Sequence, residues 1–310
     1  MNTGNYGKVA VLMGGLSAER EVSLKSGSAV LAALQKQGVD AHGIDAGKDV
    51  LQVLARGQYT RAFIALHGRW GEDGVIQGAL EVLGIPYTGS GVLGSALGMD
   101  KLRCKQLWAG CGIPTPEFAV YTDEPGLAAI AGRLGYPLFV KPAHEGSSIG
   151  IGKATSLDEL RRACVQAARY DRTVLIERCI VGPELTAGIL GERELPLIRL
   201  ETPRAFYDYE AKYLLDSTRY LCPSGLTYEQ ERRVQALARR AFDSVGCRGW
   251  GRVDFMLDGA GNPYVLEVNT VPGMTDHSLV PMAARHAGLS FEQLVMRILE
   301  LSMENSNREQ

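Results

Sequence analysis

Two apolar runs joined by a Gly-rich turn, at residues 251–269, constrain the fold most strongly. The turn is rich in Gly, Asn, Asp and Pro, which is typical of a β-hairpin. Side chains alternate faces along a strand, so Glu267 and Asn269 point the same way, and an antiparallel partner can place Asp254 beside them. Two carboxylates and an amide oxygen on one sheet face predict a Mg²⁺ site shared with substrate phosphates.

A solvated sheet face is the alternative interpretation, because acidic residues are common on such faces. It fits less well here, since the neighbouring positions are strongly apolar and Arg252 stands two residues before Asp254 on the same face. We therefore favour the metal site.

Length and composition limit the classes of function. The chain has 310 residues, enough for two or three domains, and its formal net charge of -2 gives no support to nucleic-acid binding. No apolar run approaches a membrane span, and the N-terminus lacks the pattern of a signal peptide, so we expect no membrane partner. Six cysteines without metal-ligand spacing indicate free thiols in a reducing cytoplasm.

The first hundred residues alternate strands and helices, which predicts an open, mostly parallel α/β domain over residues 1–100. Ligands of such sheets lie at the carboxyl ends of the strands, so residues 14–19 and 67–73 should lie near one another. The expected strands are 8–13 and 61–66, and the expected helices are 21–37 and 73–83.

The rest of the chain predicts two smaller units, 101–182 and 183–310, with a Pro-rich linker at 111–116 and an irregular loop at 205–224. The expected strands are 136–142, 149–154, 173–180, 184–190 and 194–201, besides the hairpin. The expected helices are 95–109, 156–170, 227–245, 279–287 and 290–303.

Several motifs carry weaker signals. The Gly/Ser loop at 145–150, shortly after Lys141, reads as a phosphate-covering loop, although Gly/Ser turns are common. Glu19 opens a helix and either complements its dipole or receives a cationic amine. His67 ends a strand and by itself favours a structural role. The loop at 273–279 either holds a carboxylate on its N–H groups or is simply capped by Ser278.

Taken together, these motifs resemble the ATP-grasp superfamily and, within it, the D-alanine–D-alanine ligase family. They run from residue 8 to beyond residue 300 in the family's order, so the match is close and full-length. They are Leu12-Met-Gly-Gly-Leu-Ser-Ala-Glu-Arg-Glu-Val-Ser23, Ala65-Leu-His-Gly-Arg-Trp-Gly-Glu-Asp-Gly74, Pro86-Tyr-Thr-Gly-Ser90, Met99-Asp-Lys101, Val140-Lys-Pro142, Glu145-Gly-Ser-Ser148, Tyr209-Glu-Ala-Lys-Tyr213, Gly251-Arg-Val-Asp254 and Leu266-Glu-Val-Asn-Thr-Val-Pro-Gly-Met-Thr275.

The resemblance implies an N-terminal open parallel α/β domain followed by a two-part ATP-grasp fold, with the metal site in the C-terminal part. It also implies the ligands of the nucleotide. Two Mg²⁺ ions, or Mn²⁺, would be held by Asp254, Glu267 and Asn269, with Glu267 bridging. ATP phosphates would contact Lys101, Lys141 and Lys212. The base and ribose would contact Glu177, Cys179, Ile180, Glu184 and Phe206.

The remaining implied roles concern two D-alanine molecules. Glu19 would bind the first ammonium with His67 nearby, and Ser147 and Tyr213 would join Glu19 in a network that closes the site. Arg252 and the Gly273 N–H would stabilise an oxyanion, and Ser278 and Leu279 would hold the second carboxylate. Cys179 stands where some relatives carry a bulky residue, and His144 lies in a variable part of the Gly/Ser loop. Both positions bear on nucleotide affinity rather than on the chemistry.

The implied reaction makes D-alanyl-D-alanine through a D-alanyl phosphate, releasing ADP and phosphate, for peptidoglycan precursor synthesis by a cytoplasmic homodimer. Two alternatives stay open. Another ATP-grasp ligase could make a D-alanine–D-lactate ester, although Tyr213 resembles the dipeptide makers. The protein could instead be a catalytically silent nucleotide sensor or assembly protein, although the intact metal and phosphate residues argue against this. The base that deprotonates the second amine is not identified.

Overall fold

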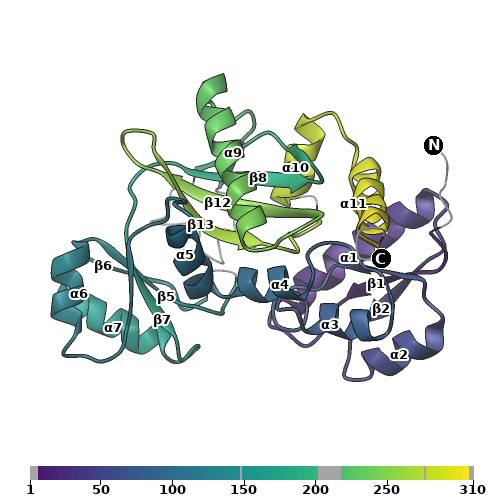
Figure 1. Cartoon of the computed structure of the whole chain (residues 1–310), viewed down its shortest axis with the longest axis horizontal. Coiled ribbons are helices and arrows are strands. Elements are labelled where there is room, and N and C mark those ends of the chain that lie inside the picture. Colours follow the sequence, from purple (N-terminus) through teal and green to yellow (C-terminus); the bar gives the residue numbers. More distant parts are fainter. Residues whose placement is uncertain (1–5, 147–148, 202–217, 276, 307–310) are drawn as a thin grey trace.

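The computed structural model describes residues 6–146, 149–201, 218–275 and 277–306. Its N-terminal part is a parallel sheet in the order β2-β1-β3, flanked by helices (Figure 1). The strands are β1 (Val9–Met13), β2 (Ala41–Asp45) and β3 (Arg61–Ile64), and the helices are α1 (Arg20–Lys36), α2 (Val50–Gly57), α3 (Val75–Val82) and α4 (Val92–Met99). The predicted parallel α/β arrangement is confirmed, although the prediction omitted β2, whose mixed and mostly exposed sequence is a weak signal, and α2, which has only eight residues.

The predicted continuous helix 95–109 is wrong. Helix α4 ends at Met99 and α5 (Lys101–Gly110) begins directly afterwards, because Asp100 between them is extended, with φ -96° and ψ 95°. The Asp100 side chain accepts a hydrogen bond from the Arg103 N–H and so caps α5. This break puts Lys101 in the first turn of a new helix.

The central part is an antiparallel sheet in the order β4-β7-β5-β6, with two helices on it. The strands are β4 (Phe118–Val120), β5 (Leu138–Pro142), β6 (Gly152–Ala154) and β7 (Val174–Arg178), and the helices are α6 (Leu127–Leu134) and α7 (Leu157–Ala167). Their apolar residues form one core cluster. The sequence prediction did not include β4 or α6.

The C-terminal part is a sheet in the order β11-β10-β8-β12-β13, with β9 paired to β8. The strands are β8 (Glu184–Leu190), β9 (Arg193–Glu194), β10 (Ile198–Glu201), β11 (Arg219–Leu221), β12 (Trp250–Leu257) and β13 (Pro263–Asn269). The helices are α9 (Tyr228–Ser244), which begins with a capping box, α10 (Leu279–His286) and α11 (Phe291–Ser306). The predicted strand 194–201 is therefore two strands, β9 and β10.

Strands β12 and β13 form the predicted hairpin. Asp254 pairs with Glu267, and Arg252 pairs with Asn269, so these four side chains share one face. The register then shifts, because Phe255 pairs with Val265 and leaves Leu266 as an extra residue on β13. This β-bulge changes which β13 side chains face the core.

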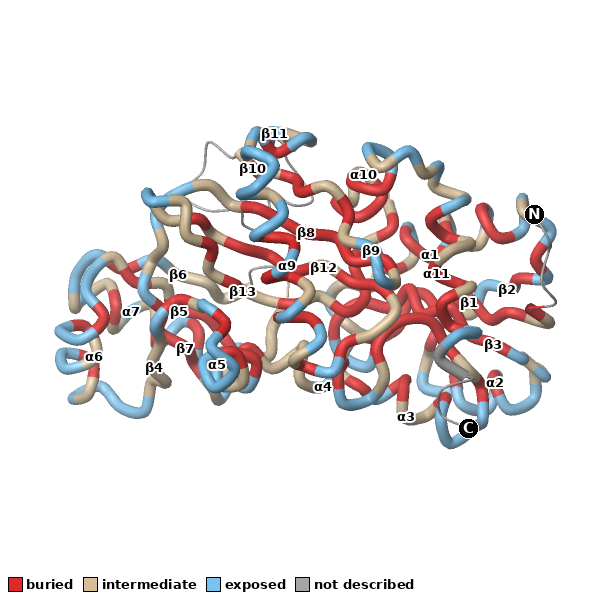
Figure 2. The backbone as a smooth tube through the Cα atoms, turned by 45° about the horizontal axis from the view of Figure 1, so that its top comes forward, coloured by how far each residue is buried: buried red, intermediate tan, exposed pale blue. Residues whose placement is uncertain are grey.

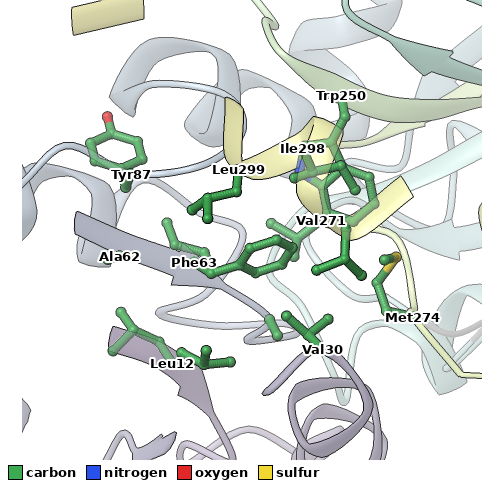
Figure 3. Packing of buried hydrophobic residues seen from close by; sticks show 14 of the residues in the cluster. Leu12, Val30, Ala62, Phe63, Tyr87, Trp250, Val271, Met274, Ile298 and Leu299 are labelled. Carbon is green, nitrogen blue, oxygen red and sulfur yellow. The ribbon is translucent and has the colours of Figure 1, made fainter. Parts of the chain in front are cut away.

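The hydrophobic clusters join segments that are distant in sequence. Cys104 and Trp108 of α5 pack with α9 and with the C-terminal sheet rather than with the central sheet. Helices α10 and α11 pack with the N-terminal sheet, where Val30 and Phe63 meet Val271, Met274, Ile298 and Leu299 (Figure 3). Figure 2 shows buried backbone concentrated in β1, β8 and β12. The three-part division of the chain stays a prediction.

Within the described ranges, no helix combines the length and the apolar character that a bilayer crossing requires.

The packing of α5 gives a stability prediction. Trp108 is 0% exposed, and its indole N–H donates to the Ala241 carbonyl, 3.1 Å away. We expect Trp108→Ala to lower the free energy of unfolding by about 3–5 kcal/mol, because it removes a large buried side chain and leaves a cavity. Urea unfolding measures this loss. Tyr228→Ala is the control, because Tyr228 is 80% exposed, and a similar loss in both variants would contradict the role of α5 in this core.

Candidate functional site

Two adjoining cavities lie where the parts of the chain meet. The larger, of about 650 Å³, is lined by the central sheet and by β8, β10, β12 and β13, and we call it the first cavity. The smaller, of about 340 Å³, is lined by residues 16–19, 68–70 and Met99, and we call it the second cavity. Glu145, Gly146 and Ile149 line both cavities, so the Gly/Ser loop forms a wall between them.

The hairpin face borders the first cavity. Asp254 and Glu267 both belong to its lining. Arg252 donates to both carboxylate oxygens of Asp254, at 2.8 and 2.7 Å, and the Thr186 hydroxyl donates to one of them, at 2.6 Å. Lys101 lies 3.4 Å from Glu267. Each carboxylate of this face thus has a cationic partner within 4 Å.

The donor set of the hairpin fits a hard cation that is shared with a ligand. Among the described residues, no group of three or more His, Cys, Asp or Glu side chains is placed to hold a metal. Asp254 and Glu267 therefore need the Asn269 amide oxygen, which accepts a hydrogen bond from the Val271 N–H at 3.1 Å, and oxygens from outside the protein. Mg²⁺ is commonly bound in this way, through one or two carboxylates and substrate phosphates.

A buried carboxylate lies between two lysines at the back of the first cavity. Glu177 is 3% exposed, and its Oε1 lies 2.8 Å from Lys141 Nζ and 3.2 Å from Lys105 Nζ. Burial alone would raise the pKa of Glu177, but the charges of Lys105 and Lys141 outweigh it and hold the pKa below its ordinary value. Glu177 is therefore an ionised acceptor beside the cavity.

The second cavity contains Glu19, at the N-terminus of α1. Its side chain makes no cap hydrogen bond with that helix. A Cβ atom at Gly68 would lie 2.7 Å from Glu19 Oε2, and one at Gly146 would lie 3.3 Å from it. The carboxylate thus fits between two glycines, one from the N-terminal part and one from the Gly/Ser loop, because neither glycine has a side chain.

His67 lies behind this cavity. Its Nδ1 lies 3.2 Å from Glu72, and its Nε2 lies 3.3 Å from the Ser26 hydroxyl. Burial alone would lower the pKa of His67, but the Glu72 carboxylate raises it above the ordinary value. The Ser26 hydroxyl also accepts a hydrogen bond from the Met274 N–H at 3.1 Å, which links His67 to the segment after β13.

That segment carries two further predicted residues. Ser278 stands at the N-cap of α10 but makes no side-chain cap hydrogen bond. Its hydroxyl instead accepts from the Thr275 N–H at 2.9 Å, and a Cβ at Gly273 would lie 2.8 Å from that hydroxyl. Simple capping therefore does not account for Ser278. Leu279 is 7% exposed and packs in the N-terminal core cluster.

The structure brings most of the predicted nucleotide residues to the first cavity: Lys101, Lys141, Glu177, Cys179, Ile180, Glu184, Asp254 and Glu267 all line it. Burial raises the pKa of the Cys179 thiol. Ser147, Phe206, Lys212 and Tyr213 lie outside the described residues.

Sequence reasoning missed Lys105, Thr186, Glu72 and the ion pair of Arg69 with Glu145, which are 2.7 Å apart. Helical spacing is a signal for Lys105, since it stands four residues after Lys101 and so lies on the same side of α5. Strand alternation is a signal for Thr186, which stands two residues after Glu184.

Two family models match the sequence of this chain. A family model described as the D-ala D-ala ligase C-terminus matches residues 107–300, and one described as the D-ala D-ala ligase N-terminus matches residues 53–90. The chain belongs to the D-alanine–D-alanine ligase family. A D-alanine–D-alanine ligase from Nitrosococcus oceani is 61% identical over 299 residues, which cover 96% of this chain and 95% of that protein.

Solved structures of D-alanine–D-alanine ligases share the fold. The crystal structure of one from Bacillus anthracis is 36% identical, with a TM-score of 0.88, and the alignment covers 98% of this chain and 99% of that chain. The structure of the Bacillus anthracis ligase complexed with ATP is 34% identical with a TM-score of 0.84 and the same coverage. These likenesses confirm the predicted mixed α/β architecture and the ATP-grasp fold, and they identify the chain as a ligase enzyme.

The buried position of Glu177 predicts how stability depends on pH. Glu177→Gln leaves Lys105 and Lys141 without their shared counter-charge, so we expect a loss of about 3–5 kcal/mol in the free energy of unfolding near pH 7. The folded-state pKa of Glu177 lies below the ordinary value of 4.5. The ionised carboxylate therefore contributes stability above that value and loses it as the pH falls further. The difference between wild type and variant should shrink in urea unfolding at acidic pH.

Glu117 provides the matched control. It also pairs with two cations, Arg133 and Arg178, but its side chain is 42% exposed. We expect Glu117→Gln to cost less than about 1 kcal/mol. Equal losses at Glu117 and Glu177 would show that burial does not strengthen the Glu177 cluster.

Proposed function

We propose that the protein uses ATP to join two D-alanine molecules into D-alanyl-D-alanine, releasing ADP and phosphate. One observation carries the proposal: two cavities of different chemistry share a wall formed by Glu145, Gly146 and Ile149. The first cavity has the volume and the lysines for a nucleotide, and the second has an acidic residue, Glu19, for an ammonium group. The names of the relatives support the same substrates.

The chemistry requires activation of a carboxylate, which is a poor electrophile at neutral pH. Transfer of the ATP γ-phosphoryl group to the carboxylate of the first D-alanine gives a D-alanyl phosphate and ADP. Lys101 and Lys141, with Lys212 outside the described residues, would neutralise the phosphate oxygens. Two Mg²⁺ ions, or Mn²⁺ in their place, held by Asp254, Glu267 and Asn269, would supply further charge neutralisation when bound.

The second half of the reaction forms the peptide bond. The neutral amine of the second D-alanine attacks the acyl carbon to form the C–N bond of a tetrahedral species, and the acyl C–O bond breaks as phosphate leaves. The proton that the nitrogen loses departs on the phosphate as HPO4²⁻. Arg252 and the Gly273 N–H would stabilise the oxyanion, and Ser278 and Leu279 would hold the second carboxylate. Glu19 would hold the first ammonium throughout, with His67, Ser147 and Tyr213 around it.

The intermediate must be protected, because an acyl phosphate is hydrolysed when water enters. The loop at 145–150 contributes to the walls of both cavities, which supports a role in covering the reacting atoms. We assign the same role to the segment at 205–224, most of which lies outside the described residues.

The adenosine moiety would occupy the first cavity, against Glu177, Cys179, Ile180 and Glu184, with Phe206 against the base. The product would enter peptidoglycan precursor synthesis, a cytoplasmic step of cell-wall biogenesis that determines cell shape, and the working form would be a homodimer. The family resemblance supports these assignments.

The direct test is ADP release with Mg²⁺-ATP and D-alanine, compared with L-alanine and with D-lactate plus D-alanine, and identification of the product by mass. We expect release that requires D-alanine and yields the dipeptide. Glu267→Gln should lower kcat at least about 100-fold, because it removes a carboxylate ligand of the Mg²⁺ ions that would neutralise the transferring group. The control is Glu292→Gln, because Glu292 on α11 pairs with Lys36 on α1, away from both cavities. This variant should leave the rate unchanged. ATP binding without turnover on any substrate pair would overturn the proposal.

Gly68 provides a separate test of the second cavity. Gly68→Ala would place a Cβ 2.7 Å from Glu19 Oε2. The carboxylate must then shift, so we expect the KM for D-alanine to rise about tenfold or more, as for the loss of a charge-assisted hydrogen bond. Steady-state kinetics at saturating ATP measures this change.

Gly84→Ala is the matched control. Gly68 and Gly84 have nearly the same positive φ, of +68° and +66°, but a Cβ at Gly84 meets nothing within 4 Å. Both variants carry the same left-handed strain of about 1–2 kcal/mol. An equal rise of KM in both would show that strain, and not the crowding of Glu19, is responsible.

A further inference from the structure

Lys105 is a buried lysine that the proposed reaction does not use. Its side chain is 0% exposed, and lysine is almost never fully buried unless its charge is paired. Its ammonium lies 3.2 Å from Glu177 Oε1. Glu177 and Lys141 line the first cavity, whereas Lys105 does not belong to the described lining. Lys105 therefore stands behind Glu177, with the carboxylate between it and the cavity.

Fixed groups hold the ammonium of Lys105 in place. It donates to the Thr115 hydroxyl at 2.7 Å and to the Pro116 carbonyl at 3.4 Å, and it lies 5.6 Å from the centre of the Phe118 ring. The Thr115 hydroxyl in turn donates to the Val265 carbonyl of β13 at 2.9 Å. Because these groups surround it, Lys105 cannot follow a ligand into the cavity.

Lys141 differs from Lys105 in this respect. It lies 2.8 Å from the same Glu177 oxygen, but it is 10% exposed and lines the first cavity. When Lys141 turns to a phosphate, Glu177 loses this partner. A buried carboxylate without a counter-charge is strongly unfavourable, so the remaining lysine decides whether Glu177 stays ionised and in place.

We propose that Lys105 is a positioning residue that keeps Glu177 ionised and oriented toward the nucleotide while Lys141 contacts the phosphates. This inference rests on the proposed function, because it requires that ATP occupy the first cavity. Lys105 acts through Glu177 and does not touch the nucleotide. Two lysines share one carboxylate so that one lysine is released on ATP binding and the other is retained.

The charges around Lys105 provide a pH readout. The pKa of Lys105 is lowered to about 8, because burial, together with the charge of Lys141, lowers it more than the charge of Glu177 raises it. The other titratable neighbour, Cys104, has a pKa that burial raises far above the ordinary range. When Lys141 moves away, the pKa of Lys105 rises, so ATP binding takes up a proton and weakens as the pH rises above about 8. A purely structural lysine would not give this dependence.

The main variant is Lys105→Met, which keeps most of the volume and removes the charge. We expect the KM for ATP to rise about 10- to 100-fold, with kcat and the KM for D-alanine changing less than about threefold. The weakening of ATP binding above about pH 8 should also disappear. Lys8→Met is the matched control, because Lys8 likewise donates to a carbonyl, of Gly57, and lies 4.7 Å from an aromatic ring, of Tyr59, but lines neither of the two cavities.

A comparison in the Glu177→Gln background keeps the proposal testable if Lys105→Met alone does not fold. In the Glu177→Gln background the carboxylate charge is absent, so adding Lys105→Met should change the dissociation constant for ATP less than about threefold. A further tenfold weakening in that background would show that Lys105 acts on the nucleotide independently and would overturn the proposal. Wild-type affinity in Lys105→Met would also overturn it, whereas wild type that neither binds nor uses ATP would instead refute the proposed function.

Discussion

The β-bulge in the hairpin of β12 and β13 decides which side chains reach the first cavity. Before the bulge, Val265 faces the core, and strict alternation would turn residue 267 to the same side. The extra residue at Leu266 reverses the alternation, so Leu266 and Glu267 both line the cavity and Val268 returns to the core. The pairing of Glu267 with Asp254 therefore depends on one inserted residue, with apolar packing fixed on both sides of it.

Ion pairs between carboxylates and cationic side chains surround the first cavity. Asp254 pairs with Arg252, Glu267 with Lys101, and Glu177 with Lys105 and Lys141. Burial of carboxylates without cationic partners would be unfavourable, and lysines without acidic partners would repel one another. Paired charges stay ionised in a partly buried site, and phosphate oxygens can then replace carboxylate oxygens as partners of the lysines at modest cost.

Much of the fold and of the site could be predicted from the sequence, because its strongest signals are local. The alternation in residues 251–269 gave the hairpin and the shared face of Asp254, Glu267 and Asn269. The break at Asp100 could not be predicted in this way, since the apolar pattern of 95–109 continues across it and only the capping of α5 reveals it. Lys105 was missed for a different reason. Its role depends on the ion pair with Glu177, which is 72 residues away in the chain, and no local pattern encodes that contact.

The position of Gly146 ties the two cavities to one another. It lines both of them, and its missing side chain leaves space for the Glu19 carboxylate. Its neighbour Glu145 is held from two directions, because Arg69 pairs with the side chain and Lys101 donates to the backbone carbonyl at 2.7 Å. Arg69 lines the second cavity, and Lys101 lines the first. A displacement of Glu145 and Gly146 would therefore alter the walls of both cavities.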